Sequence, residues 1–244
     1  MDEDRHEDRV PHGGDSDPIG SNELRIMNSR VREVLLRYWD FPLFDAILRK
    51  HSITLDDTAI LDVGCGSGYT TLLISEMFTP RRLDAFDIVP SQVARANRRG
   101  INARFFVADV TAPKLPSRSY DAIFVCGVLH HCPEWRTGLA RVAELLRDGG
   151  VLLLEEPDAH HIRVETLLMG HPPANGAWTG LAPLRTEMRR VGLAVIEERP
   201  LFFGLFGSFL CVKMAGADSP NFLIARNLLR SPARGLAEGQ EAPA

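Results

Sequence analysis

A glycine-rich turn in the first third of the chain sets the strongest constraint on the fold. A short apolar run meets three closely spaced glycines, and a helical pattern begins directly after them, in the segment ILDVGCGSGY at 60–69. Glycine lets the backbone turn sharply and lets a ligand approach the main chain closely. The helix after the turn presents unpaired N–H groups in its first turn. The segment therefore predicts a strand, a tight turn and a helix around a nucleotide-like ligand.

The rest of the chain continues this alternation of short apolar runs and helical patterns. Periodicity predicts helices at 21–38, 41–50, 69–78, 91–98 and 134–147, and strands at 58–63, 83–88, 103–107, 121–126 and 151–155. Alternating strands and helices predict a parallel sheet with right-handed crossovers and helices on both faces. The last two strands, 193–198 and 208–213, have no helix between them, which predicts an antiparallel hairpin at a sheet edge.

Composition divides the chain into a central domain and two tails. Residues 1–20 are charged and contain almost no large apolar residues, so we expect them to be disordered. We assign 21–55 to an N-terminal helical lid and 56–215 to the α/β domain, with an insert at 158–182 beside an acceptor pocket. Residues 216–244, rich in alanine, proline and glycine, form a C-terminal tail.

Charge and cysteine content narrow the class of protein. The net charge is −4, with no basic excess for a general grip on nucleic acid. The acidic start is the opposite of a signal peptide, and the longest nearly apolar stretch, 201–212, is too short to span a bilayer. Four cysteines without a C-x-x-C pair suggest reduced thiols. We therefore predict a cytoplasmic protein that binds neither membrane nor nucleic acid; its oligomeric state stays open.

The spacing of glycines and acids separates two cofactor classes. A dinucleotide fingerprint needs G-x-G-x-x-G, but Tyr69 stands where its third glycine would fall. Asp62 precedes the first glycine by two residues. Asp87 ends the second strand, where an acid can bond both ribose hydroxyls. A further acid, Asp109, comes after the third strand.

Four motifs in register resemble those of class I S-adenosylmethionine-dependent methyltransferases. They are DVGCGSG at 62–68, Asp87, VAD at 107–109 and GVLHH at 127–131. The small-molecule group, which includes the ubiquinone/menaquinone methyltransferases, is the most similar. The resemblance covers about 56–157 well and implies a Rossmann-like, doubly wound, seven-stranded sheet of order 3-2-1-4-5-7-6 with the seventh strand antiparallel.

The resemblance also implies where S-adenosylmethionine binds. The glycines would line its methionine part, with Asp62 orienting the amino group. Asp87 would hold the ribose hydroxyls, and Asp109 would accept from the adenine. The residues assigned to the cofactor are Asp62, Gly64, Cys65, Gly66 and Gly68, then Asp87 and Ile88, then Ala108 and Asp109, and finally Cys126 and Gly127.

Histidines and acids come after the fourth and fifth strands, whose carboxyl ends meet at one edge of such a sheet. The candidate catalytic residues are His130, His131, Glu156 and His160. Three interpretations stay open: the histidines shape the pocket floor, one of them deprotonates the acceptor with an acid orienting it, or the cluster binds a metal. The spacing matches no standard metal motif, so no metal ligand is assigned.

Aromatic residues outside the cofactor-binding half suggest the acceptor. The candidate pocket residues are Tyr38, Trp39, Trp178, Phe203 and Phe206. Aromatic-lined clefts suit flat organic molecules, although these rings could equally cover the sheet as core. We predict methyl transfer to a small aromatic or polyketide-like acceptor, with O-methylation ahead of C- or N-methylation. The alternatives are a protein that binds S-adenosylmethionine for another reaction or as a sensor, and a nucleotide-binding redox enzyme.

Overall fold

The computed structural model describes residues 30–163 and 177–214 of the chain. The expected tails at 1–20 and 216–244 lie outside these residues, as does most of the insert assigned at 158–182. The described residues form one sheet with helices packed against it.

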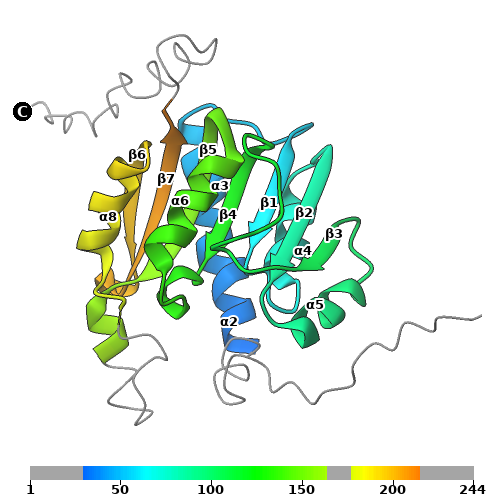
Figure 1. Cartoon of the computed structure of the whole chain (residues 1–244), viewed down its shortest axis with the longest axis horizontal. Helices are drawn as coiled ribbons and strands as arrows, with labels where there is room; N and C mark the ends of the chain where they lie inside the picture. Colours follow the sequence, from blue (N-terminus) through cyan, green and yellow to red (C-terminus); the bar gives the residue numbers. More distant parts are fainter. Residues whose placement is uncertain (1–29, 164–176, 215–244) are drawn as a thin grey trace, which may run out of the picture.

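This sheet has seven strands in the order β3-β2-β1-β4-β5-β7-β6 (Figure 1). The strands are β1 Ala59–Val63, β2 Arg82–Asp87, β3 Arg104–Val107, β4 Tyr120–Cys126, β5 Leu146–Pro157, β6 Leu193–Leu201 and β7 Phe206–Lys213. Strands β1 to β5 pair in parallel, and β7 pairs antiparallel with both β5 and β6. The predicted fold class, strand order and antiparallel seventh strand are confirmed.

Helices cover both faces of the sheet, each over its own apolar core (Figure 1). The helices are α2 Arg30–Leu35, α3 Phe41–Lys50, α4 Tyr69–Met77, α5 Pro90–Asn97, α6 Trp135–Leu145 and α8 Leu181–Arg190. Residues of α3 and α4 pack in one core, and residues of α6 and α8 pack in the other. Burial on both faces explains why β1 is buried at every position and is apolar throughout except at Asp62.

The N-terminal region is one helical segment with a wider turn inside it. A π-helical turn, Leu36–Asp40, joins α2 directly to α3, where the sequence predicted two separate helices. In α3, Phe41 stacks on Phe124 of β4 at 5.8 Å between ring centroids, and Phe44 is fully buried. Helix α3 is thus part of the core, and α2 with the π turn is the part that lies beyond the carboxyl ends of the parallel strands (Figure 1).

The boundary between α6 and β5 differs from the prediction. The helix predicted to end at Arg147 ends at Leu145, and β5 begins at Leu146, opposite Tyr120. Gly149, which follows the predicted helix and is of a type that often ends helices, lies within the strand with φ of +78°. A glycine in this conformation suits an irregularity in a strand as well as a helix terminus, because neither tolerates a Cβ easily there. The local pattern could not separate the two.

Candidate active site

The glycine-rich turn takes the shape that its residues predict. Gly64, Gly66 and Gly68 all have positive φ, at +68°, +52° and +84°. A Cβ at Gly64 would come within 2.4 Å of Cγ2 of Val128, whereas a Cβ at Gly66 would meet nothing within 4 Å. Gly64 is therefore required by packing, and the backbone at Gly66 borders open space that a ligand can approach.

Asp87, at the end of β2, anchors this turn. Its Oδ2 accepts the N–H of Gly66 at 2.8 Å, and its Oδ1 accepts the N–H of Val89 at 2.9 Å. Burial raises the pKa of the Asp87 carboxyl, opposed by these two N–H groups and by the nearby His131. The carboxylate thus holds the turn and the start of α5 in place at the edge of the cofactor region.

Asp62 lies beneath the turn with an unsatisfied oxygen. Its Oδ2 accepts the hydroxyl of Thr71 at 2.6 Å, and the side chain is almost fully buried. Among the described residues, its Oδ1 has no hydrogen-bond partner. Burial is the main reason that the pKa of Asp62 is raised to about 7. A buried oxygen of this kind is costly unless a donor reaches it, so the site fits a ligand that carries an amino group.

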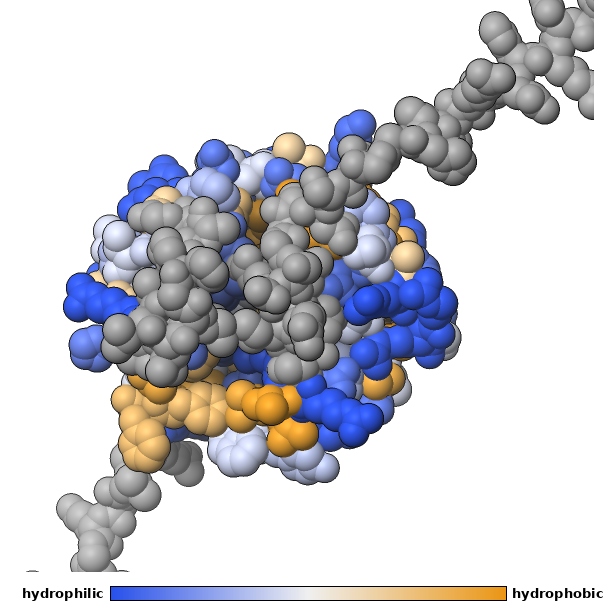
Figure 2. Space-filling model, turned by 90° about the horizontal axis from the view of Figure 1, so that it is seen from below, coloured by the Kyte–Doolittle hydropathy of each residue, from blue (hydrophilic) through white to orange (hydrophobic). Residues whose placement is uncertain are grey.

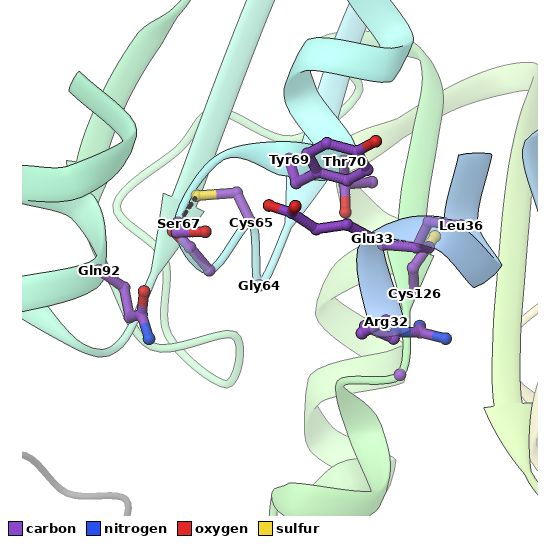
Figure 3. Close-up of a pocket in the computed structure, with 12 residues that line it drawn as sticks. Arg32, Glu33, Leu36, Gly64, Cys65, Ser67, Tyr69, Thr70, Gln92 and Cys126 are labelled. Carbon is purple, nitrogen blue, oxygen red and sulfur yellow. Dashed lines mark hydrogen bonds between the residues drawn. The ribbon is translucent and has the colours of Figure 1, made fainter. Parts of the chain in front are cut away.

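A cleft opens between the turn and α2, enclosing about 560 Å³, part of it open to solvent (Figure 3). Of the predicted cofactor residues, Gly64, Cys65, Gly66, Cys126 and Gly127 line it. The further lining residues are Arg32, Glu33, Leu36, Ser67, Tyr69, Thr70 and Gln92. None of these seven residues was predicted from the sequence to contact the cofactor.

Of the lining residues that were not predicted, Gln92 is the one that the sequence pattern indicates most clearly. It is 2% exposed on α5, and its Oε1 has no hydrogen-bond partner within the part of the chain that the structure describes. It lies at the end of the cleft opposite Arg32 (Figure 3). A glutamine at a buried helical position, five residues after Asp87, is the pattern that could have found it, because a buried amide needs partners.

The predicted adenine-side residues lie at the neighbouring strand ends. Ile88 is 43% exposed, and Val107, which belongs to the motif at 107–109 but was not predicted to contact the cofactor, is 52% exposed. The N–H of Ala108 donates to the backbone oxygen of Asp87 at 3.0 Å. Asp109 accepts the N–H and the hydroxyl of Thr111 through Oδ1. Exposed apolar side chains beside an acid make a surface suited to a flat heterocycle with an amino group.

Polar contacts fasten α2 and the π turn to the cofactor region. Arg99 donates to the backbone oxygen of Ser67 at 2.6 Å and to Glu33 of α2 at 3.2 Å. Arg37 donates to the hydroxyl of Tyr69 at 2.9 Å and to Glu76 at 2.8 Å. The residue that breaks the dinucleotide fingerprint, Tyr69, is thus an attachment point for the N-terminal segment.

On the opposite face of the sheet, Glu156 organises the turn that carries the histidines. Its Oε1 accepts the N–H groups of Val128 and Leu129 at 2.9 and 2.7 Å. Its Oε2 lies 2.8 Å from Nδ1 of His130, whose ring centroid is 3.8 Å from that of His131. Burial, followed by the neighbouring His131, lowers the pKa of His130, although Glu156 opposes this. His130 is therefore neutral at pH 7, with Nδ1–H donated to the carboxylate and a lone pair on Nε2.

The predicted cluster around these histidines is smaller than expected. His130, His131 and Glu156 are brought together, but His160 is exposed, and the structure places it in no hydrogen bond with them. Its backbone N–H donates to Asp158 instead. Within 30–163 and 177–214, no group of three or more His, Cys, Asp or Glu side chains is placed to hold a metal ion. Within the part of the chain that the structure describes, Glu156 contacts Nδ1 of His130, as an acid that orients a base would.

Trp178, predicted in the acceptor pocket, belongs to the core. It is 6% exposed, packs edge-on against Trp135 at 5.2 Å and donates Nε1–H to the backbone oxygen of Pro157. Its ring lies 6.4 Å from His130. An aromatic residue in an apparent loop can be buried once its indole N–H finds a partner, and an acceptor role for Trp178 remains a prediction. Trp178 thus packs in the core next to His130.

The other predicted acceptor residues do not line the cleft that the structure shows. Tyr38, Trp39 and Phe203 are 65%, 50% and 109% exposed. Trp39 and Phe206 both contact Phe202, at 6.1 and 6.0 Å between ring centroids. Apolar residues gather on part of the surface at the end of the molecule where the parallel strands end (Figure 2). An acceptor role for these four rings remains a prediction.

Comparison with known proteins identifies the class of domain. Residues 60–150 match the family model described as a methyltransferase domain. Residues 60–150 are a methyltransferase domain. An uncharacterised methyltransferase of Mycobacterium tuberculosis is 33% identical over 111 residues, which cover 45% of this chain and 55% of that protein. A trans-aconitate 2-methyltransferase of Methylobacterium radiotolerans is 34% identical over 118 residues, covering 48% and 45%. The chain spans about half the length of these relatives.

Solved structures show the same fold for the methyltransferase domain and its flanking elements. An S-adenosylmethionine-dependent methyltransferase from Mesorhizobium loti matches 70% of this chain and 96% of its own, with a TM-score of 0.58 and 15% identity. The predicted class I methyltransferase fold is confirmed, and the family implies S-adenosylmethionine as the cofactor. Among the described residues, no helix is long and apolar enough to cross a membrane.

Proposed function

We propose that this chain transfers a methyl group from S-adenosylmethionine to an oxygen of a small organic acceptor, aromatic or polyketide-like. The observation that carries the proposal is the buried His130–Glu156 pair at the carboxyl ends of β4 and β5. Gly127 connects this pair to the cleft, since a Cβ there would lie 3.7 Å from Cε1 of His130. A base therefore stands beside the proposed methyl donor.

The cofactor roles follow from the unsatisfied and open groups of the cleft. The unpartnered Oδ1 of Asp62 would accept from the amino group of the methionine part. The open backbone at Gly66 would lie against that part, and Asp87 would accept from the ribose hydroxyls. Gln92, with its unpartnered Oε1, would add a second polar contact on the α5 side. Ile88 would pack against the adenine.

The chain's own contribution to the reaction is alignment and proton removal. When bound, S-adenosylmethionine supplies an electrophilic methyl group on a sulfonium. Glu156 holds the imidazole of His130 in the tautomer whose Nε2 can accept a proton, and burial keeps that ring neutral. His130 would take the proton of an acceptor hydroxyl as the oxygen attacks the methyl carbon. His131, stacked on His130, would border the same space.

Two observations bear on the acceptor. The exposed rings of Tyr38, Trp39 and Phe203 at the same end of the molecule suit a flat organic molecule. The relative from Methylobacterium radiotolerans is named for a small organic acid, trans-aconitate, which supports a small-molecule acceptor over a macromolecule. We propose O-methylation ahead of C- or N-methylation because a nearby base assists a hydroxyl most directly.

Methyl-labelled S-adenosylmethionine tests this function. The full chain would be incubated with it and with phenols, hydroxylated polyketides and small carboxylic acids, and labelled products identified by mass spectrometry. We expect a labelled methyl ether or ester, and we expect the His130→Ala variant to lose ether formation while it still binds the cofactor. Tight cofactor binding without transfer to any acceptor would instead support a sensor or a different reaction on the same fold.

A further inference from the structure

Arg32 of α2 brings a cation into the cleft from outside the methyltransferase motifs. Its Nη2 lies 2.7 Å from Oε2 of Glu155 in β5, and its Nη1 lies 3.5 Å from Oδ2 of Asp40. The side chain is 23% exposed and lines the cleft beside Cys126 (Figure 3). Gly127 also lines the cleft. The guanidinium is therefore in contact with two buried acids and with the space in which a ligand would lie.

The π turn explains how Arg32 and Asp40 reach one another. Residues eight apart in a regular α-helix point about 80° away from each other. The wider π turn at Leu36–Asp40 reduces this divergence and places both side chains over the end of β5. π turns are rare and occur often at functional sites, because they turn side chains away from the regular helical positions.

Gly127 leaves room for the guanidinium at the end of β4. Its φ is +68°, and a Cβ there would lie 3.2 Å from Nη2 of Arg32 and 3.7 Å from Cε1 of His130. Atoms of the cation and of the proposed base thus lie within 4 Å of one position beside the backbone of Gly127. A ligand group near Gly127 would be close to both the guanidinium and the imidazole.

The charges around Arg32 do not explain it as a stabilising feature. Asp40 is fully buried, and burial followed by the neighbouring Glu155 raises its pKa to about 8, so it is mainly protonated at pH 7. Neither oxygen of Asp40 has a hydrogen-bond partner among the described residues. A buried ion pair such as Arg32–Glu155 contributes little to stability, and apolar residues in its place are often neutral or better. The arrangement therefore indicates a ligand-binding role.

The chemistry of the cleft indicates the ligand group. Asp62, Asp87 and Glu33 make the surroundings acidic, which suits the amino group and the sulfonium of the cofactor but repels an anion. The planar fork of an arginine matches a carboxylate in two parallel hydrogen bonds. We propose that Arg32 binds a carboxylate in this cleft, a role that rests on the proposed function. The carboxylate comes from the methionine part of the cofactor or from an acidic acceptor.

Two replacements of Arg32, one neutral and one charged, test the subsite by binding alone. Calorimetry would compare S-adenosylmethionine with its decarboxylated analogue on the wild type, Arg32→Gln and Arg32→Lys. If the cofactor supplies the carboxylate, the wild type prefers the intact cofactor by about tenfold or more, R32Q removes most of this preference and R32K keeps part of it. Arg37→Gln is the matched control, because Arg37 comes from the same helical segment but contacts Tyr69 and Glu76; it should preserve the preference.

A second arm detects an acceptor carboxylate. Protein saturated with S-adenosylhomocysteine would be titrated with benzoate and with benzamide. Benzoate binding that R32Q abolishes, together with an unchanged cofactor preference, assigns the subsite to the acceptor. If R32Q changes neither the cofactor preference nor benzoate binding, the proposal is wrong. Thermal melts of R32Q and R32K confirm folding, and since no methyl transfer is measured, the result is independent of the proposed reaction.

Discussion

Replacing Glu156 by glutamine changes one buried group that sets the state of the proposed base. The carboxylate accepts backbone N–H groups through Oε1 and faces Nδ1 of His130 through Oε2. In the Glu156→Gln variant, the amide oxygen can keep the two backbone donors, but its NH₂ group then faces His130. The ring would turn to the other tautomer, with Nδ1 accepting from the amide and Nε2 carrying a hydrogen. His130 would then present a donor to the acceptor in place of a lone pair.

The effects of this substitution on kcat and on stability can both be estimated from the structure. General base catalysis by a positioned side chain is worth about 10²–10⁴-fold, so we expect kcat to fall by that range. One charge-assisted hydrogen bond is lost, which lowers the free energy of unfolding by about 1.5–3 kcal/mol. For a chain of this size that lowers Tm by about 3–12 °C. Affinity for the cofactor should stay within about twofold, because Glu156 does not line the cleft.

The assay is steady-state methyl transfer across pH, with thermal melts on the same preparations. Because burial lowers the pKa of His130 below its ordinary value of 6.5, wild-type activity should rise with pH in the acid range and be level at pH 7. In E156Q this acid limb should disappear. Glu144→Gln makes the same chemical change at an exposed helical position and should alter neither kcat nor Tm. An E156Q enzyme with unchanged kcat and an unchanged acid limb would refute the assignment of His130 as base.

Three further predictions concern the cofactor region. Asp87→Ala should weaken S-adenosylmethionine binding by about 1–3 kcal/mol in calorimetry, and unchanged affinity would remove its ribose role. Gly64→Ala should lower the free energy of unfolding in urea by about 2–4 kcal/mol, because its Cβ would strike Val128 at a positive φ, whereas Gly66→Ala should lose only about 1–2 kcal/mol. The pKa of Asp62 is raised from 3.8 to about 7, so the ligand-free fold loses stability as pH rises from about 4 to 7, and the full loss is present above pH 7. Asp62→Asn should therefore raise Tm more at pH 8 than at pH 5 while it weakens cofactor binding; a loss of Tm at pH 8 would contradict this.

The local sequence pattern was sufficient to predict the strands of the sheet and the glycine-rich turn. Strands covered on both faces contain apolar runs, such as residues 151–154 of β5, and glycines at positive φ mark the turn at 64–68 whatever lies around it. The end of α6 was misplaced because Gly149 fits both a helix terminus and an irregular strand. The pairing of Leu146 with Tyr120 of β4 places Gly149 in a strand, and the local sequence gives no information about this pairing.

The candidate site was less predictable, because its contacts join distant parts of the chain. Arg32 reads as one polar residue on a helix, and its partner Glu155 is 123 residues further on. His130 and His131 are equivalent in sequence, but the short helical turn that carries them directs only Nδ1 of His130 to Glu156. Trp178 reads as a loop aromatic, and its burial depends on Trp135 and on the backbone oxygen of Pro157, more than 20 residues earlier in the chain.

The attachment of α2 has a consequence for how quickly the cleft can empty. No residue of α2 is buried, and the contacts Arg37–Glu76 and Arg99–Glu33 join partly exposed side chains. Such pairs weaken as the screening length falls from about 10 Å at 0.1 M salt to about 3 Å at 1 M. Since α2 forms one wall of the cleft, salt should shorten the residence time of a bound nucleoside by speeding its departure, more than it slows its arrival. Ionic strength would thus change the rate of product release without changing the residues that take part in methyl transfer.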